Sequence, residues 1–159
     1  MKSIYLLLGE NDTKKSSVVR CLLGVGRIDM QVEVQSMSGL TRHIRALVCA
    51  AQEGPLTPKE LLDELNNYNW DGKFSNIRNA LVPLRYNLIP TKESKYPNAE
   101  DYVTALLDDG WIIKGCVSLG EEARDWLKNS GLPYISIPNS RQMPGNAVAA
   151  IVRKAFDWV

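Results

Sequence analysis

A glycine, a lysine and a serine near the start of the sequence have a spacing that suits the binding of an anion. Gly9 follows an apolar run, and Lys15 and Ser16 come six and seven residues later, where a helical pattern begins. The backbone N–H groups of such a turn, together with the positive end of the helix dipole behind it, attract phosphate groups. A lysine adds a full positive charge, and a hydroxyl group can bind Mg²⁺. The segment therefore predicts a phosphate-binding loop.

Residues 9–16, Gly-Glu-Asn-Asp-Thr-Lys-Lys-Ser, resemble the phosphate-binding loop (Walker A motif) of P-loop nucleotide hydrolases and kinases, G-x-x-x-x-G-K-[ST]. Gly9 matches the first glycine, Lys15 the lysine and Ser16 the hydroxyl residue. The resemblance implies ATP or GTP with Mg²⁺ as the cofactor, with the lysine on the terminal phosphates and Ser16 on the metal ion. The residues that it implies for nucleotide binding are Gly9, Glu10, Asn11, Asp12, Thr13, Lys14, Lys15, Ser16 and Ser17.

Two features depart from the pattern of that family. Lys14 stands where the family has its second glycine, whose lack of a Cβ lets the backbone approach the phosphate. Its side chain opens the loop, adds a second positive charge, or points to solvent. In addition, no apolar run ends in an Asp or Glu that would hold Mg²⁺ through water. Glu121 is the nearest acidic candidate, but its position is typical of the first turn of a helix. The sequence assigns no catalytic residue.

Two arginines are candidates for contact with a phosphate of the substrate or nucleotide. Arg85 ends a predicted strand, and it would face the phosphate-binding loop if that strand lies next to the first one. Arg141 follows the last predicted strand. Both can also be read as ordinary arginines at strand ends. A second basic group, Arg42, His43 and Arg45, is interpreted as the solvated face of a helix.

The chain alternates apolar runs with helical patterns, which predicts a mainly parallel sheet with helices on both faces. We expect a three-layer α/β/α, P-loop NTPase-like fold with about five strands. The predicted strands are 4–8, 30–35, 80–86, 111–119 and 133–137, and the predicted helices are 15–25, 40–51, 58–66, 99–109, 121–129 and 144–158. Ligands bind at the carboxyl ends of such strands, which selects residues 9–16, 35–39, 85–87, 118–121 and 138–141. Residues 54–98 are expected to include a helical or irregular insertion.

Length and composition exclude several classes of protein. The chain has 159 residues, which predicts a single domain over 1–159, and its formal net charge is +1. The near-zero charge argues against a strongly basic nucleic-acid coat. We expect no membrane-spanning segment and no signal peptide. The three cysteines are expected to be buried and reduced, which indicates a cytoplasmic protein, and the single histidine argues against a zinc site.

Three functions remain open from the sequence. The first is nucleotide binding of the P-loop class, in a small phosphotransferase. The second is a degenerate P-loop scaffold or interaction module that binds a protein partner without hydrolysis. The third and least favoured is a helix-turn-helix DNA-binding regulator over residues 40–70, whose second helix carries one basic and three acidic side chains.

Overall fold

A computed structural model describes residues 1–10, 13–24, 31–68, 78–87 and 96–159 of the chain. The strands within these residues form one sheet in the order β2-β3-β4-β1-β5-β6. They are β1 (Lys2–Gly9), β2 (Gln31–Gln35), β3 (Thr41–Ala46), β4 (Arg78–Arg85), β5 (Ile112–Leu119) and β6 (Tyr134–Ile137). Every neighbouring pair is parallel except β2 with β3. The prediction of an α/β fold with a mainly parallel sheet is confirmed.

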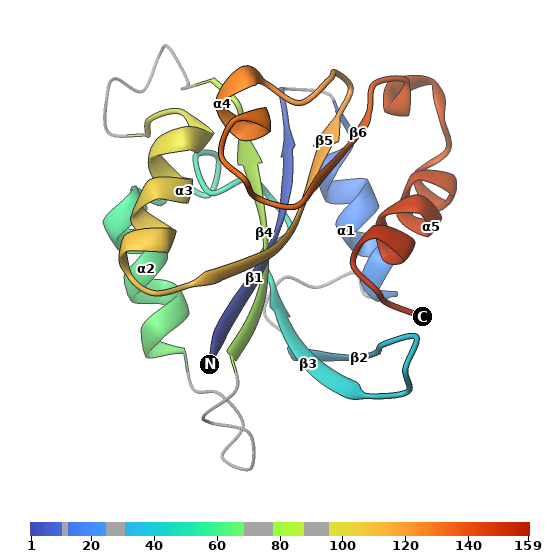
Figure 1. Cartoon of the computed structure of the whole chain (residues 1–159), viewed down its shortest axis with the longest axis horizontal. Helices are drawn as coiled ribbons and strands as arrows, with labels where there is room; N and C mark the ends of the chain where they lie inside the picture. Colours follow the sequence, from blue (N-terminus) through green and yellow to red (C-terminus); the bar gives the residue numbers. More distant parts are fainter. Residues whose placement is uncertain (11–12, 25–30, 69–77, 88–95) are drawn as a thin grey trace.

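Helices cover both faces of the sheet (Figure 1). The helices of the described residues are α1 (Lys15–Leu23), α2 (Pro58–Asn67), α3 (Ala99–Asp108), α4 (Asp125–Lys128) and α5 (Gly145–Ala155). α2 and α3 share one hydrophobic core with one face of the sheet, and α1 and α5 share a second core with the opposite face. No helix of the described part of the chain is long and apolar enough to cross a membrane.

The central strand β1 is buried on both faces, as its continuous apolar run predicts. Ile4, Leu6 and Leu8 belong to the core under α2 and α3. Tyr5 and Leu7 point the other way, into the core under α1 and α5. Because successive side chains of a strand alternate between faces, this one segment joins the two cores and fixes the position of Gly9 at its end.

The predicted helix at 40–51 is wrong, because Thr41–Ala46 is strand β3. It pairs with β2 on one side and with β4 on the other. Ile44 and Ala46 face the core under α1 and α5. Apolar residues at helical spacing are buried here by an extended chain, since pairing within the sheet overrides the local periodicity. The helix-turn-helix alternative loses its first helix with this finding.

The basic residues at 42–45 therefore do not form a solvated helix face. Arg42 donates to the Tyr5 hydroxyl at 2.6 Å, and Arg45 is buried. The Arg45 guanidinium pairs with a Glu64 carboxylate oxygen at 2.6 Å and lies 3.9 Å from the centre of the Tyr68 ring. These contacts give both arginines a role in packing.

Residues 54–98, where a helical or irregular insertion was expected, hold helix α2 and strand β4. Helix α2 begins as predicted, with Pro58 in its first turn and the Glu60 N–H donating to the Thr57 hydroxyl at 3.1 Å. Residues 69–77 and 88–95 of this stretch lie outside the described residues.

The cysteines of the chain differ in burial. All three are free thiols, as expected, but only Cys116 is buried, and Cys21 and Cys49 are half-buried. Burial raises the pKa of Cys116 to about 12.

Candidate anion-binding site

The candidate site lies at the carboxyl end of β1, where the chain turns into α1. The chain leaves β1 through α1 toward β2 on one side of the sheet and leaves the adjacent strand β5 toward β6 on the other. The edge at which connections diverge from two neighbouring parallel strands is the usual place for a ligand in this kind of fold. The predicted segment at 35–39 does not contribute, because β2 is antiparallel and ends at the opposite edge.

Lys15 is the central side chain of the loop and is only 5% exposed. Its ammonium group donates to the Gly9 carbonyl at 3.2 Å, the Glu10 carbonyl at 2.7 Å and the Thr13 hydroxyl at 3.3 Å. Burial lowers the pKa of this lysine to about 8. The loop thus wraps around its own lysine and holds the charge of that lysine at the carboxyl end of β1.

Lys14 occupies the position that the motif gives to glycine, and its backbone is left-handed, with φ 63° and ψ 26°. Glycine adopts this conformation without strain, whereas a Cβ makes it costly. The exposed Lys14 side chain turns away from the loop, and its Nζ donates to the Met143 carbonyl at 3.1 Å. The sequence left open whether this side chain opens the loop, adds a second positive charge or points to solvent; in the structure it is exposed and also ties the loop to the segment before α5.

Two glycines let the loop pack against the end of β5. A Cβ at Gly9 would lie 2.5 Å from the Thr13 hydroxyl oxygen and 2.9 Å from the Leu119 carbonyl oxygen. Gly120 has φ +76°, and a Cβ there would lie 2.7 Å from the Thr13 γ-methyl group. Thr13 itself is 0% exposed and donates to the Glu10 carbonyl at 2.8 Å. The loop is therefore closely packed on its inner side.

Both predicted arginines lie near Lys15. Arg85 is paired in register with Gly9 across β4 and β1, so the strand adjacency expected from the sequence is present. Arg141 lies beside Gly120, with its guanidinium carbon 3.4 Å from a Cβ built there. The charges of both arginines lower the pKa of Lys15, whereas those of Glu53 and Glu10 raise it, so three cations and two carboxylates lie close together at this end of β1. The Arg85 Nε is buried and has no hydrogen-bond partner among the described residues.

The remaining predicted loop residues divide into three groups. Ser16 is half-buried and Ser17 exposed in the first turn of α1. Glu10 follows Gly9 and turns toward the end of β4. Asn11 and Asp12 lie outside the described residues.

Glu10 and Arg124 form a polar network that sequence reasoning missed. The Asn87 N–H donates to a Glu10 carboxylate oxygen at 2.8 Å, and an Arg124 nitrogen lies 3.6 Å from the same oxygen. Arg124 also donates to Asn87 Oδ1 at 2.6 Å, and its guanidinium lies 4.4 Å from the centre of the Tyr86 ring. The network joins the loops that follow β1, β4 and β5.

Glu121 does not lie in a helical turn, contrary to the sequence interpretation. Helix α4 begins only at Asp125, and the Glu121 carboxylate accepts a hydrogen bond from Arg124 Nε at 2.8 Å. Glu121 is therefore an ion-pair partner of the network. The part of the chain that the structure describes contains no group of three or more potential His, Cys, Asp or Glu metal ligands.

Gln52 and Glu53 also belong to the site, and no sequence pattern identified them as candidates. The negative charge of Glu53 is the charged neighbour with the largest effect on Lys15, whose pKa it raises. Gln52 is buried and bonds to the backbone of Arg85. Both follow β3, which the apolar periodicity had assigned to a helix.

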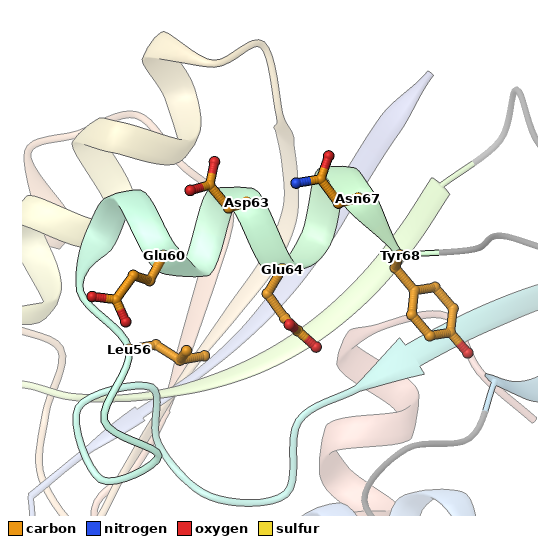
Figure 2. Close-up of a pocket in the computed structure, with 6 residues that line it drawn as sticks. All are labelled: Leu56, Glu60, Asp63, Glu64, Asn67 and Tyr68. Atoms are coloured by element: carbon orange, nitrogen blue, oxygen red, sulfur yellow. The ribbon is translucent and has the colours of Figure 1, made fainter.

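A separate hollow of about 560 Å³ runs along α2 (Figure 2). It is lined by Leu56, Glu60, Asp63, Glu64, Asn67 and Tyr68. Its three carboxylates repel phosphate, so the hollow is a poor candidate for an anion site despite its size.

The fold and the site define an α/β protein with a cluster of charged side chains at the carboxyl edge of its sheet. A comparison of the chain with protein-family models, with curated proteins and with solved structures found no match.

Proposed function

We propose that this protein binds the phosphate groups of a nucleotide, ATP or GTP with Mg²⁺, at residues 9–17, in the manner of P-loop proteins. The observation that carries the proposal is the convergence of Lys15, Arg85 and Arg141 at the carboxyl end of β1. The carboxylates of Glu53 and Glu10 offset part of the repulsion among these cations, and an anion with several negative oxygens would offset the rest.

Each part of the loop has a role in this proposal. The N–H groups at the start of α1 face the phosphate, and the dipole of this nine-residue helix favours negative charge there. The Lys15 ammonium exchanges its bonds to loop oxygens for bonds to phosphate oxygens. Mg²⁺ keeps most of its water and is held by the Ser16 hydroxyl and the phosphates, because Mg²⁺ sites with nucleotides need only one or two protein oxygens.

Phosphoryl transfer is the reaction that this arrangement suits. Such transfer depends on positioning and on charge neutralisation more than on covalent chemistry. Arg85 and Arg141 would stabilise the negative charge of the transferred group. In this proposal the protein acts as a small phosphotransferase whose acceptor is unspecified.

One feature favours the second candidate, a scaffold without turnover. The Lys15 ammonium is already bonded to three oxygen atoms of its own loop. A loop that satisfies its lysine internally can persist as a structural element. In that case we expect anion binding without multiple turnovers.

Calorimetry with ATP and GTP in the presence of Mg²⁺ tests the proposal. The wild type should bind, and Lys15→Met should lose at least about tenfold in affinity, the change expected from losing a charge-assisted hydrogen bond. Lys114→Met is the matched control, because Lys114 is an exposed lysine on β5. Absence of heat with the wild type would reject nucleotide binding, and equal loss in the two variants would reject the role of Lys15.

A chelator experiment separates the metal from the loop. Removal of Mg²⁺ with EDTA should weaken nucleotide binding and leave sulfate binding unchanged, because the loop contacts the anion directly. Conversion of ATP to ADP, or of GTP to GDP, over many turnovers distinguishes the phosphotransferase from the scaffold, because the γ-phosphoryl group then passes to water or to another acceptor and the diphosphate is released each time.

A further inference from the structure

Gln52 is a buried polar residue with an unusual set of partners. It lies in the turn after β3 and is 0% exposed. Its side-chain oxygen accepts from the Arg85 backbone N–H at 3.0 Å, and its side-chain nitrogen donates to the Arg85 carbonyl at 2.9 Å. The same nitrogen donates to the Pro97 carbonyl at 3.2 Å. One amide group thus satisfies both polar backbone groups of Arg85.

The Gln52 amide bonds to β4 on the side where β3 pairs with it, beyond the end of β3. The last residue of β3 in register with β4 is Ala46, opposite Leu81. Beyond that pair, β4 continues to Arg85 on the β1 side, where the Tyr86 N–H donates to the Gly9 carbonyl at 3.3 Å. The N–H and C=O of one strand residue point to the same side, so those of Arg85 face the space that β3 has left. The Gln52 amide fills this space as a peptide group would.

We propose that Gln52 is a positioning residue of the anion site, which fixes the backbone of Arg85 so that its guanidinium stays beside Lys15. The inference rests on the proposed function. Without Gln52, the backbone N–H and C=O groups of Arg85 would lose their hydrogen bonds to the Gln52 side chain. The guanidinium would then move away from Lys15, because the two positive charges repel each other.

The next residue, Glu53, acts on Lys15, whereas Gln52 acts on Arg85. Its carboxylate raises the pKa of Lys15, in opposition to Arg85 and Arg141. Glu10 acts in the same direction as Glu53. The turn after β3 therefore contributes twice: one side chain holds an arginine in place, and its neighbour compensates the charge of the lysine.

The first test measures the pKa of Lys15 by ¹³C NMR of its Cε, without any ligand. In the wild type we expect a value of about 8. Arg85→Met removes a charge that lowers this pKa, so the value should rise. Gln52→Met should give a smaller rise in the same direction, because Arg85 moves away. Leu65→Ala is the control: it removes buried packing from α2 and should leave the pKa of Lys15 unchanged.

The second test measures tripolyphosphate binding by calorimetry in a double-mutant cycle. Gln52→Met should weaken binding about tenfold in the wild-type background, because the displaced Arg85 guanidinium would lose a charge-assisted hydrogen bond to the phosphate. It should have little effect in the Arg85→Met background, because the residue that it positions is gone. An equal loss in both backgrounds would overturn the inference.

If Gln52→Met does not fold, Gln52→Asn tests the positioning role in its place. Gln52→Asn keeps the amide but shortens its reach, so it cannot bond to both groups of Arg85. It should raise the pKa of Lys15 in the same direction. An unchanged pKa in a folded Gln52 variant, alongside a raised pKa in Arg85→Met, overturns the positioning role. The two proposals fail separately: absence of anion binding rejects the proposed function, whereas the pKa test needs no ligand.

Discussion

Lys15 combines two properties that usually exclude each other in a side chain. It is almost completely buried, yet its ammonium group makes three hydrogen bonds that favour the charged form. Burial has the larger effect, and the pKa falls to about 8. The charge of the site is therefore sensitive to pH in a range where most lysines are fully protonated.

The affinity for sulfate should fall as the pH rises through about 8, because the lysine loses the charge that attracts the anion. Sulfate keeps its own charge over this range. The measurement is calorimetric titration from pH 6.5 to 9.5 for the wild type and Lys15→Met. Arg85 and Arg141 remain charged throughout, so binding should weaken without vanishing. A wild-type affinity that stays flat across this range would contradict the assignment.

The stability of the unliganded protein should change in the opposite direction. The pKa of Lys15 is about 8 in the folded state and near 10.5, the ordinary value for a lysine, in the unfolded chain. Between these values the unfolded chain binds more protons, so the contribution of Lys15 to the free energy of unfolding rises with pH. The difference between wild type and Lys15→Met in urea unfolding at pH 7.5 and 9.5 isolates this contribution. A difference that does not change with pH would contradict it.

Lys14 carries backbone strain that a glycine would remove. Lys14→Gly should be more stable than Lys14→Ala by about 1 kcal/mol, because only the glycine adopts a φ of 63° without cost. Both variants lose the bond from Lys14 Nζ to the Met143 carbonyl, so their difference reports the strain alone. Urea unfolding measures it. If the two variants are equally stable, the left-handed backbone at this position costs nothing.

At the scale of elements, the loop between β1 and α1 packs closely against the turn after β5. Gly120→Ala should destabilise the protein by about 2 to 4 kcal/mol, from backbone strain together with the contact on the Thr13 γ-methyl group. Thr13→Ser removes that methyl group and should recover part of the loss. Thermal unfolding of the two single variants and the double variant measures the recovery. Strict additivity would show that the two loops are not in contact.

The elements themselves were largely readable from the sequence. The apolar run at 4–8 predicted a strand, and it lies in β1. The helix predicted from residue 58 begins at that residue. The spacing from Gly9 to Lys15 predicted the turn from a strand into a helix that begins at Lys15. Each of these signals is local, and the structure does not override it. The segment 40–51 failed because its apolar spacing suits a helix, whereas pairing with β2 and β4 decides its conformation.

The site was predictable only where it is continuous in sequence. Lys15 belongs to a motif, and Arg85 and Arg141 could be chosen because they end or follow strands. The order of the strands in the sheet brings Gln52, Glu53 and Arg124 to the candidate site, and no local sequence pattern predicts that order. Their side-chain types carry no signal, since a glutamine or a glutamate after a strand is ordinary in a surface loop.

At the scale of the whole molecule, the near-zero net charge hides an uneven distribution. At the carboxyl edge three cations lie beside the carboxylates of Glu10 and Glu53, while the hollow along α2 is lined by three carboxylates. An anion therefore meets less repulsion at the carboxyl edge of the sheet than at the hollow.

Cys116 offers a probe of the stability of the whole fold. It is buried in the centre of β5, and its pKa is raised to about 12, so a thiol reagent should label it only when the sheet opens. In a Cys21→Ser, Cys49→Ser variant it is the only thiol. The free energy of opening from labelling rates should equal the free energy of unfolding from urea titration. A markedly lower value would mean that β5 opens locally.

The position of β1 has a consequence for synthesis. Its residues are made before their partners in the sheet, 78–85 and 112–119, and α1 is made before 145–155, against which it packs. The apolar residues 4–8 therefore remain uncovered until the residues of β4 and β5 have left the ribosome. Such long-range pairing slows folding and leaves an apolar strand exposed in the meantime.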